Sequence, residues 1–246
     1  MNDRFKEKER YDARASLELA AKDNTKLPLI NSYLIEPYEF YNKSLKEIPS
    51  NSKVLEIGAG MGENTEYLLK LGHSVCATDI SSKSVEVMKK KYSNYDLFSA
   101  QVADMESLPF ESNSFDCVCS AGSLSYGDNK IVMDEIHRVL NKKGFFITVD
   151  SLNHNIIFRL NRYIHYLNGS RSKSTLKRMP NIKLIKNYEK KFGYIHVKYF
   201  GSLTWFFPAL KLFMNDSQIK SFSQMIDKKF KIKKSAFKFV MKAIKN

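Results

Sequence analysis

The chain has 246 residues, of which 43% are hydrophobic, so it is long enough to enclose one sizeable hydrophobic core. No apolar stretch reaches the roughly 18 to 20 residues of a membrane-spanning helix, and the charged N-terminus lacks the apolar region of a signal peptide, so a cytoplasmic protein is expected. The net charge of +14 is uneven, because residues 151–246 hold 21 of the 40 Lys and Arg but 3 of the 26 Asp and Glu, which gives them +18 and residues 1–150 the remaining −4.

Two helical segments precede the first predicted strand. Residues 5–21 carry a charged helical pattern, and residues 29–47 carry a second one that Pro37 interrupts. Residues 48–53 contain a Pro, two Ser and an Asn, which favour a linker. We therefore expect an N-terminal helical segment over residues 1–50.

Short apolar runs then alternate with segments of helical spacing. Strands are predicted at residues 54–57, 74–78, 96–102, 115–119 and 144–149, and helices at residues 63–71, 81–92 and 130–140. This alternation indicates βαβ units and a parallel sheet over residues 51–151. The three cysteines, Cys76, Cys117 and Cys119, fall inside the apolar runs. Their odd number and the lack of clustered ligands predict core residues, with no disulfide framework and no metal site.

The chain changes character after the fifth predicted strand. Residues 152–215 do not fit the alternation and are predicted to form an inserted cap or substrate region above the sheet. A helix at residues 217–226 and two strands at 229–234 and 237–244, joined by a tight turn, are expected to complete the core over residues 216–246. The predicted fold is α/β, a Rossmann-like three-layer sandwich with a mostly parallel seven-stranded sheet and an antiparallel terminal hairpin.

A glycine-rich turn follows the first predicted strand. Its sequence is Glu56-Ile57-Gly58-Ala59-Gly60-Met61-Gly62, and glycines at such a junction let a ligand approach the backbone closely. The spacing G-x-G-x-G differs from the G-x-G-x-x-G of dinucleotide-binding turns. Glu56 suits a ligand that carries an ammonium group and would repel a pyrophosphate.

Residues 53–150 resemble the core of the class I S-adenosylmethionine-dependent methyltransferases. The first motif of that family is E-x-G-x-G-x-G, and an acidic residue ends its second strand, as Asp79 does here. Residues 101–110, 114–118 and 138–144 resemble three further family segments, with Lys143 in place of the usual Gly or Pro before Gly144. These five matches, in the family's order, imply S-adenosylmethionine as the cofactor and S-adenosylhomocysteine as the product.

The resemblance also implies roles for the matched residues around the methionine part of the cofactor. Glu56 would reach the methionine ammonium, directly or through water. Ser120 and Ala121, at the end of the fourth strand, would face the methionine and the methyl group. The turn under the methionine part would consist of Gly58, Ala59, Gly60 and Gly62.

The adenosine part would bind at the ends of the second and third strands. Asp79 would accept hydrogen bonds from both ribose hydroxyls, and Ile80 would pack on the adenine. Asp104 would bind the adenine amino group, and the Met105 backbone N–H would lie at the ring. All these positions are at the carboxyl ends of parallel strands, where open α/β sheets bind ligands.

Two residues are candidates for a catalytic role at the acceptor. An oxygen acceptor needs a general base, and His154, just after the fifth strand, borders the expected cofactor pocket. A helix cap or an exposed position is the alternative for this histidine. Tyr126, just past the fourth strand, is predicted either to line the acceptor pocket or to belong to the core.

Half of the eight arginines fall within one stretch of twenty residues inside the predicted insertion. Arginine suits bidentate recognition of phosphate or carboxylate, so the cluster predicts an anionic small-molecule acceptor, with O-methylation as one option. The layout also loosely resembles bacterial methyltransferases that act on sugars of surface polysaccharides. The clustered residues are Arg159, Arg162, Arg171 and Arg178.

Several alternatives stay open for the basic C-terminal region. The aromatic residues at 203–210 could form a lid over the acceptor, rest peripherally on the inner face of a membrane, or belong to the core of the insertion. The charge of +18 also suits a nucleic-acid backbone, which would make the chain an RNA methyltransferase. A non-catalytic relative that keeps the fold and binds a partner is the third functional class.

Overall fold

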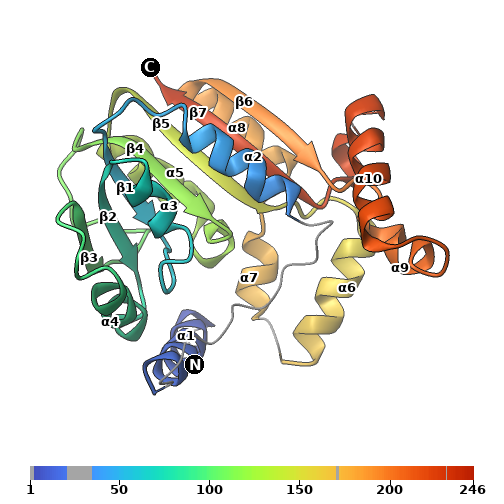
Figure 1. Cartoon of the computed structure of the whole chain (residues 1–246), viewed down its shortest axis with the longest axis horizontal. Coiled ribbons are helices and arrows are strands. Elements are labelled where there is room, and N and C mark those ends of the chain that lie inside the picture. The colour runs from blue at the N-terminus through green and yellow to red at the C-terminus, as the bar shows by residue number, and fades with distance from the viewer. Residues whose placement is uncertain (1–2, 21–34, 170–171, 231) are drawn as a thin grey trace.

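The computed structural model describes residues 3–20, 35–169, 172–230 and 232–246. Within them, seven strands form one sheet in the order β3-β2-β1-β4-β5-β7-β6 (Figure 1). All neighbouring strands are parallel except β7, which runs antiparallel to β5 and β6. The strands are β1 (Lys53–Ile57), β2 (Ser74–Asp79), β3 (Phe98–Val102), β4 (Phe115–Ala121), β5 (Leu140–Ser151), β6 (Gly193–Phe200) and β7 (Lys238–Lys245).

Ten α-helices are present in the described residues. Pro37 lies in the first turn of α2, where a missing N–H costs no helical hydrogen bond, so α2 begins near this proline instead of being interrupted by it. Residues 29–34 of the predicted second helix lie outside the described residues. The helices are α1 (Asp3–Ala20), α2 (Glu36–Leu45), α3 (Thr65–Lys70), α4 (Ser82–Lys91), α5 (Asn129–Val139), α6 (Ile156–Leu167), α7 (Lys173–Arg178), α8 (Ile182–Phe192), α9 (Phe207–Leu210) and α10 (Asp216–Phe230).

Helices cover both faces of the sheet, which confirms the three-layer sandwich. Figure 1 shows α2 and α3 in front of the sheet and α5 and α8 behind it. Residues from α5 and α8 share one buried cluster with Leu55 and Phe146, and residues from α2, α3 and α4 share a second cluster with Cys117 and Cys119. Because both faces are covered, the two central parallel strands, β1 and β4, are buried over most of their length.

The antiparallel terminal pair is confirmed, but one of its two strands comes from a different part of the sequence. β7 pairs with β6, whereas the predicted strand at residues 229–234 contains the end of α10 and a 3₁₀ turn, η4 (Lys233–Ser235). The prediction was wrong because Phe230 and Ile232 alternate with lysines without any buried face. In β6 the alternation is real, since Ile195 and Val197 pack on the core.

The predicted insertion at residues 152–215 is also smaller than expected. α8 and β6 belong to the core layers, because Leu184, Ile185, Tyr188 and Phe192 recur at helical spacing and are buried. Among the described elements between β5 and α8, only α6 and α7 lie outside the layers of the sandwich, and they project from one end of the sheet (Figure 1). Among the described residues, no helix is both long and apolar enough to span a bilayer.

Candidate functional site

A cavity of about 510 Å³ lies at the carboxyl ends of β1, β2 and β4. In the strand order of this sheet, β2 lies on one side of β1 and β4 on the other. The chain segments that leave β1 and β4 therefore diverge, and open α/β sheets place their ligand sites at such a switch point. The volume is within the range of about 300 to 1,000 Å³ that is typical of small-molecule sites.

The glycine turn after β1 forms the floor of the cavity. Gly58 and Gly60 both have φ near +60°, a conformation that residues with a Cβ rarely adopt. A Cβ on Gly58 would lie 2.4 Å from the Cβ of Ser123, so this position also lacks space for any side chain. Gly62 has φ +81° and packs against the ring of Tyr92 below the floor instead of lining the cavity.

Glu56 is buried beneath this turn. Its carboxylate accepts a hydrogen bond of 2.5 Å from the hydroxyl of Thr65, the first residue of α3. Burial raises the pKa of Glu56 to about 7, although the hydrogen bond from Thr65 acts in the opposite direction. Glu56 does not line the cavity, whereas Glu63 and Asn64 of the same loop do.

Asp79 ends β2 and connects the turn to the next helix. One carboxylate oxygen accepts the N–H of Gly60 and the other accepts the N–H of Ser81, both at 2.9 Å. The side chain lines the cavity but is only 8% exposed, and burial raises its pKa against these two hydrogen bonds. Each oxygen keeps a lone pair that can accept a hydrogen bond from a ligand in the cavity.

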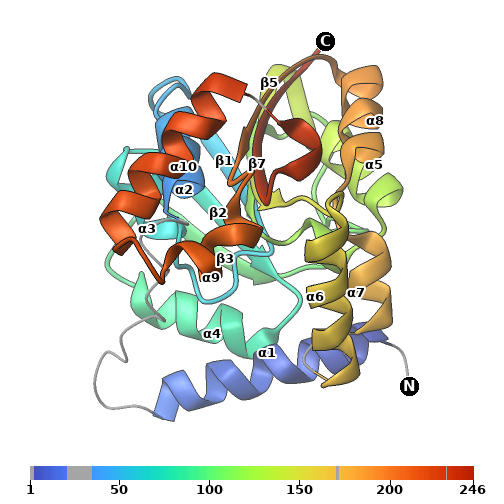
Figure 2. The ribbon, with the colours of Figure 1, turned by 90° about the vertical axis from the view of Figure 1, so that its right-hand side faces the viewer.

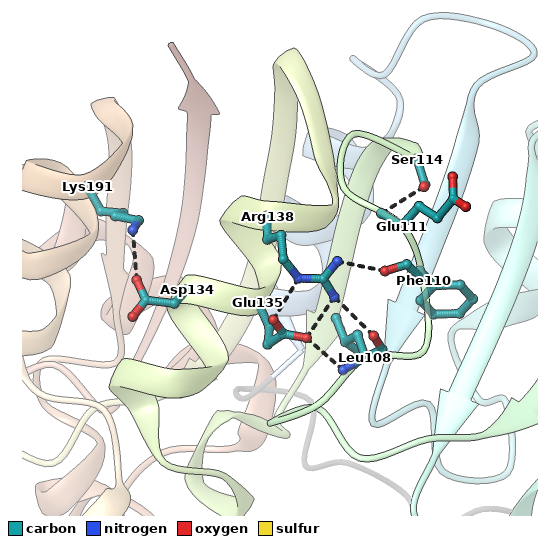
Figure 3. A network of polar contacts seen from close by, with 8 residues as sticks. All are labelled: Leu108, Phe110, Glu111, Ser114, Asp134, Glu135, Arg138 and Lys191. Atoms are coloured by element: carbon teal, nitrogen blue, oxygen red, sulfur yellow. Dashed lines mark hydrogen bonds and ion pairs between the residues drawn. The ribbon is translucent and has the colours of Figure 1, made fainter.

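The segment after β3 brings Asp104 and Met105 to the cavity wall. Figure 3 shows how this segment is held a few residues further on, because Arg138 of α5 donates hydrogen bonds to the carbonyls of Leu108 and Phe110 at 3.0 and 2.6 Å. Glu135 binds the same guanidinium and accepts the N–H of Leu108 at 2.7 Å. Two of the motifs that the sequence shares with the methyltransferases are thus joined by one hydrogen-bonded network.

The segment after β4 supplies the opposite wall. Ala121, Gly122 and Ser123 line the cavity, and a 3₁₀ turn, η2 (Leu124–Tyr126), brings Tyr126 to it. Buried Asp150, at the end of β5, accepts the N–H of Leu124 at 3.0 Å and so fixes this turn. Ser120 lies beneath the wall, where its hydroxyl pairs with that of Ser123 at 2.6 Å.

Helix α1 covers part of the cavity, which the sequence did not indicate. Glu7, Tyr11 and Arg14 of this helix are lining residues, as is Tyr38 of α2. The helix packs on α4 through a small cluster that contains Ala15. Figure 2 shows α1 along the bottom of the molecule, beneath α4.

Besides a contact of 3.5 Å from the Arg10 guanidinium to the Tyr126 hydroxyl, four polar contacts link α1 to the rest of the cavity rim. Two join it to the loops after β4 and β2, and two join it to the glycine loop and to α7. The contacts are Tyr11 to Tyr126 (2.9 Å), Asp12 to Ser81 (2.5 Å), Arg14 to Glu63 (3.5 Å) and Glu7 to Thr175 (3.1 Å).

Most positions expected to bind the cofactor lie at the cavity. Eight of the eleven line it, while Glu56, Gly62 and Ser120 support the lining from behind. Of the two predicted catalytic residues, Tyr126 lines the cavity, whereas His154 is exposed and is not a lining residue. The eight lining positions are Gly58, Ala59, Gly60, Asp79, Ile80, Asp104, Met105 and Ala121.

The predicted arginine cluster does not assemble at the cavity. Arg159 is exposed, and Arg162 is buried, with hydrogen bonds to the Leu152 carbonyl and the Asn153 side chain. Arg178 is half-buried but is not a lining residue, and Arg171 lies outside the described residues. The described residues at 203–210 do not line the cavity either. Residues of α1, and not the described part of residues 152–215, line this part of the cavity.

Residues 55–148 match a protein-family model described as a methyltransferase domain. An uncharacterized methyltransferase of Bacillus subtilis, YodH, is 35% identical over 108 residues, which cover 43% of this chain and 46% of YodH. The chain spans less than half the length of the first curated relatives that it matches.

Two solved structures share the fold. The YcgJ protein of Bacillus subtilis matches with a TM-score of 0.58 and 19% identity, over 86% of this chain and 98% of that one. Phosphoethanolamine N-methyltransferase 2 of Haemonchus contortus, in complex with phosphomonomethylethanolamine and S-adenosylhomocysteine, matches with a TM-score of 0.57 and 16% identity, over 89% of this chain and 60% of that one. The Rossmann-like fold predicted from the sequence is confirmed, and the match to the methyltransferase-domain model falls within the predicted core at residues 51–151.

Proposed function

We propose that this chain, whose residues 55–148 match a methyltransferase-domain model, transfers the methyl group of S-adenosylmethionine to a small-molecule acceptor. The observation that carries the proposal is Asp79, whose carboxylate is held by two backbone N–H groups at the rim of a cavity with a glycine floor. A carboxylate in this position accepts hydrogen bonds from the two ribose hydroxyls of an adenosyl ligand.

The charges of the cavity lining fit S-adenosylmethionine better than a dinucleotide. Asp79 and Asp104 supply acceptors for the ribose and for the adenine amino group, and Glu63 supplies one for the methionine ammonium. Arg14 is the one lysine or arginine among the described lining residues, and it suits the methionine carboxylate. A pyrophosphate would instead meet several carboxylates within a few ångströms.

Bound S-adenosylmethionine supplies a methyl group on a sulfonium, which is already a strong electrophile. The chain then has to position the acceptor for in-line attack and to exclude water from the reacting atoms. Tyr126 suits the first task, because its oxygen accepts hydrogen bonds from Tyr11 and Arg10 and its own proton is left for an acceptor oxygen or nitrogen. Helix α1 suits the second task, because Glu7, Tyr11 and Arg14 of this helix cover part of the cavity.

The acceptor belongs to the small molecules that fit beside Tyr11 and Tyr126. An anionic acceptor was expected from the arginine-rich segment, but Arg159, Arg162 and Arg178 are not lining residues. Support for a phosphate-bearing acceptor therefore comes from one relative of the same fold, which binds phosphomonomethylethanolamine. The four lining carboxylates, Glu7 and Glu63 among them, oppose an RNA backbone at the same site.

Turnover tests this function. The protein would be incubated with S-adenosylmethionine and a panel of amines, phosphate-bearing amines, sugars and tRNA, and formation of S-adenosylhomocysteine would be measured. We expect turnover with a small molecule and none with tRNA. Binding of the cofactor without turnover on any acceptor would favour a non-catalytic relative, and turnover on tRNA alone would favour the RNA methyltransferase.

A further inference from the structure

Helix α6 turns its apolar side outward. Its large apolar residues at positions 156, 160, 163, 164 and 167 fall within about 100° of one another on a helix of 3.6 residues per turn. In a helix packed on a core this stripe would be buried, yet Leu160 is 59% and Leu167 64% exposed. The exposed stripe therefore needs a different explanation from core packing.

The inward side of α6 carries the residues that hold it to the protein. Phe158 is buried against the ring of Phe237, with 5.0 Å between the ring centroids. Arg162 is 5% exposed and donates a hydrogen bond of 2.9 Å to the carbonyl of Leu152. These contacts fix the rotation of the helix, so the outward direction of the apolar stripe is part of the fold.

Two further exposed apolar pairs lie at the ends of helices α9 and α10. Leu212 and Phe213 follow α9 and are 77% and 85% exposed, and Phe230 and Ile232 flank the end of α10. Figure 1 shows α6, α9 and α10 together at the right of the molecule, and Figure 2 shows this side facing the viewer. We call these two pairs and the α6 stripe, with the lysines described next, the α6–α10 face.

Four exposed lysines surround the pair at the end of α10. Lys228 and Lys229 precede Phe230, and Lys233 and Lys234 follow Ile232. Within the described part of the chain no ion pair neutralises them. Residues 151–246, which include these lysines, carry a net charge of +18.

From this arrangement we infer that the α6–α10 face docks on the surface of an anionic lipid membrane. Exposed aliphatic and aromatic side chains enter the boundary between headgroups and acyl chains, while neighbouring lysines attract anionic headgroups. A second copy of the chain fits the face less well, because each copy would bring the same positive charge to the contact. An RNA backbone would pair with the lysines but would leave the α6 stripe in water.

Flotation with lipid vesicles tests the docking independently of any methyl transfer. The full chain would be mixed with vesicles of equal parts phosphatidylglycerol and phosphatidylcholine, and separately with vesicles of phosphatidylcholine alone. We expect binding to the mixed vesicles that is at least tenfold tighter than to phosphatidylcholine alone. Raising the salt to about 0.5 M should weaken it, because lysine attraction to the surface is screened.

Variants separate the face from the charge of the whole chain. The double variant Leu160→Glu, Leu167→Glu should lose at least tenfold in affinity for the mixed vesicles. The control Leu97→Glu, Ile131→Glu adds the same charge at two residues that are 52% and 45% exposed elsewhere on the molecule, and it should bind as the wild type does. Circular dichroism would verify that both variants fold.

Three results would overturn the inference. The first is wild-type protein that does not float with the mixed vesicles. The second is an α6 variant that binds them as tightly as its control does. The third is sedimentation evidence for a dimer that the α6 variant, but not its control, dissociates, since this would assign the face to a second copy of the chain.

Discussion

The hydroxyl of Tyr11 donates a hydrogen bond of 2.9 Å to the hydroxyl of Tyr126, and the two rings meet edge to face. This contact joins α1, at the start of the chain, to the turn after β4, 115 residues later. Burial and the neighbouring Tyr126 raise the pKa of Tyr11, so Tyr11 keeps the proton that it donates in this contact. The contact thereby fixes the orientation of Tyr126 at the cavity.

The first prediction concerns this pair. Tyr11→Phe removes the hydrogen bond but keeps the ring, so it should cost about 1 kcal/mol of interaction. We expect kcat to fall several-fold while the Kd for S-adenosylmethionine changes by less than about twofold. Tyr194→Phe, at an exposed tyrosine of β6, is the control and should leave both values unchanged. A cofactor Kd that rises as much as kcat falls would assign Tyr11 to cofactor binding instead.

The second prediction concerns the glycine floor. Gly58→Ala places a Cβ against Ser123 and also puts alanine in the left-handed region. Gly72→Ala, at φ +79° with nothing within 4 Å of the added Cβ, bears only the conformational cost of about 1 to 2 kcal/mol. Urea unfolding should show that Gly58→Ala is the more destabilising of the two. Calorimetry should show that only Gly58→Ala loses cofactor affinity. Equal effects of the two variants in both assays would contradict the close approach of Gly58 to Ser123.

The third prediction concerns the pH dependence that Glu56 creates. Its pKa in the folded protein, about 7, is above its usual value of 4.5, because burial disfavours the carboxylate. Between these two values the unfolded chain ionises and the folded chain does not, so the stabilising contribution of protonated Glu56 is lost as the pH rises towards 7. At 1.36 kcal/mol per pKa unit the loss is about 3 kcal/mol.

Glu56→Gln should remove this pH dependence and keep the contact with Thr65. The free energy of unfolding would be measured in urea from about pH 5 to pH 8. As the pH rises, the free energy of unfolding of Glu56→Gln should increase relative to that of the wild type. Glu111→Gln, at an exposed position, is the control for replacing a glutamate by glutamine. A difference between wild type and Glu56→Gln that does not change with pH would contradict the raised pKa of Glu56.

The fourth prediction concerns the network in Figure 3. Arg138→Met leaves the Leu108 and Phe110 carbonyls without their donor, and charge-assisted hydrogen bonds of this kind are worth about 1 to 3 kcal/mol each before solvent screening. We expect lower stability and weaker cofactor binding, because the same segment presents Asp104. Lys191→Met breaks the exposed ion pair with Asp134 and should change both by little. Unchanged cofactor affinity in Arg138→Met would show that the network acts on stability alone.

The core and the floor of the cavity could be predicted from the sequence because their signals are local. β1, the glycine turn and Asp79 follow one another within 27 residues. An apolar run indicates β1, the glycines indicate the turn, and the end of the second apolar run marks Asp79. Helices also separate β1 from β2, β2 from β3 and β4 from β5, so the parallel sheet followed from the pattern.

The wall of the cavity could not be predicted, because it depends on contacts between distant segments. Nothing in the local sequence of α1 indicates that Tyr11 and Arg14 reach the cavity, since their partners are 115 and 49 residues away. The burial of Arg162 could not be predicted for the same reason, because its spacing with Arg159 showed a helix face but not which side packs inward. Residues 229–234 were misassigned because alternating apolar residues and lysines look alike in a strand and in an exposed helix end.

Calorimetric titration of S-adenosylmethionine tests the central claim most directly, with S-adenosylhomocysteine and NAD as comparison ligands and Asp79→Ala as the variant. Both adenosyl ligands should bind, NAD should not, and Asp79→Ala should lose at least tenfold in affinity, about 1.4 kcal/mol. At about 100 times its Kd the cofactor should also stabilise the wild type by roughly 2.7 kcal/mol. If neither adenosyl ligand binds at millimolar concentration, or if NAD binds as tightly as they do, the assignment of this cavity to S-adenosylmethionine is wrong.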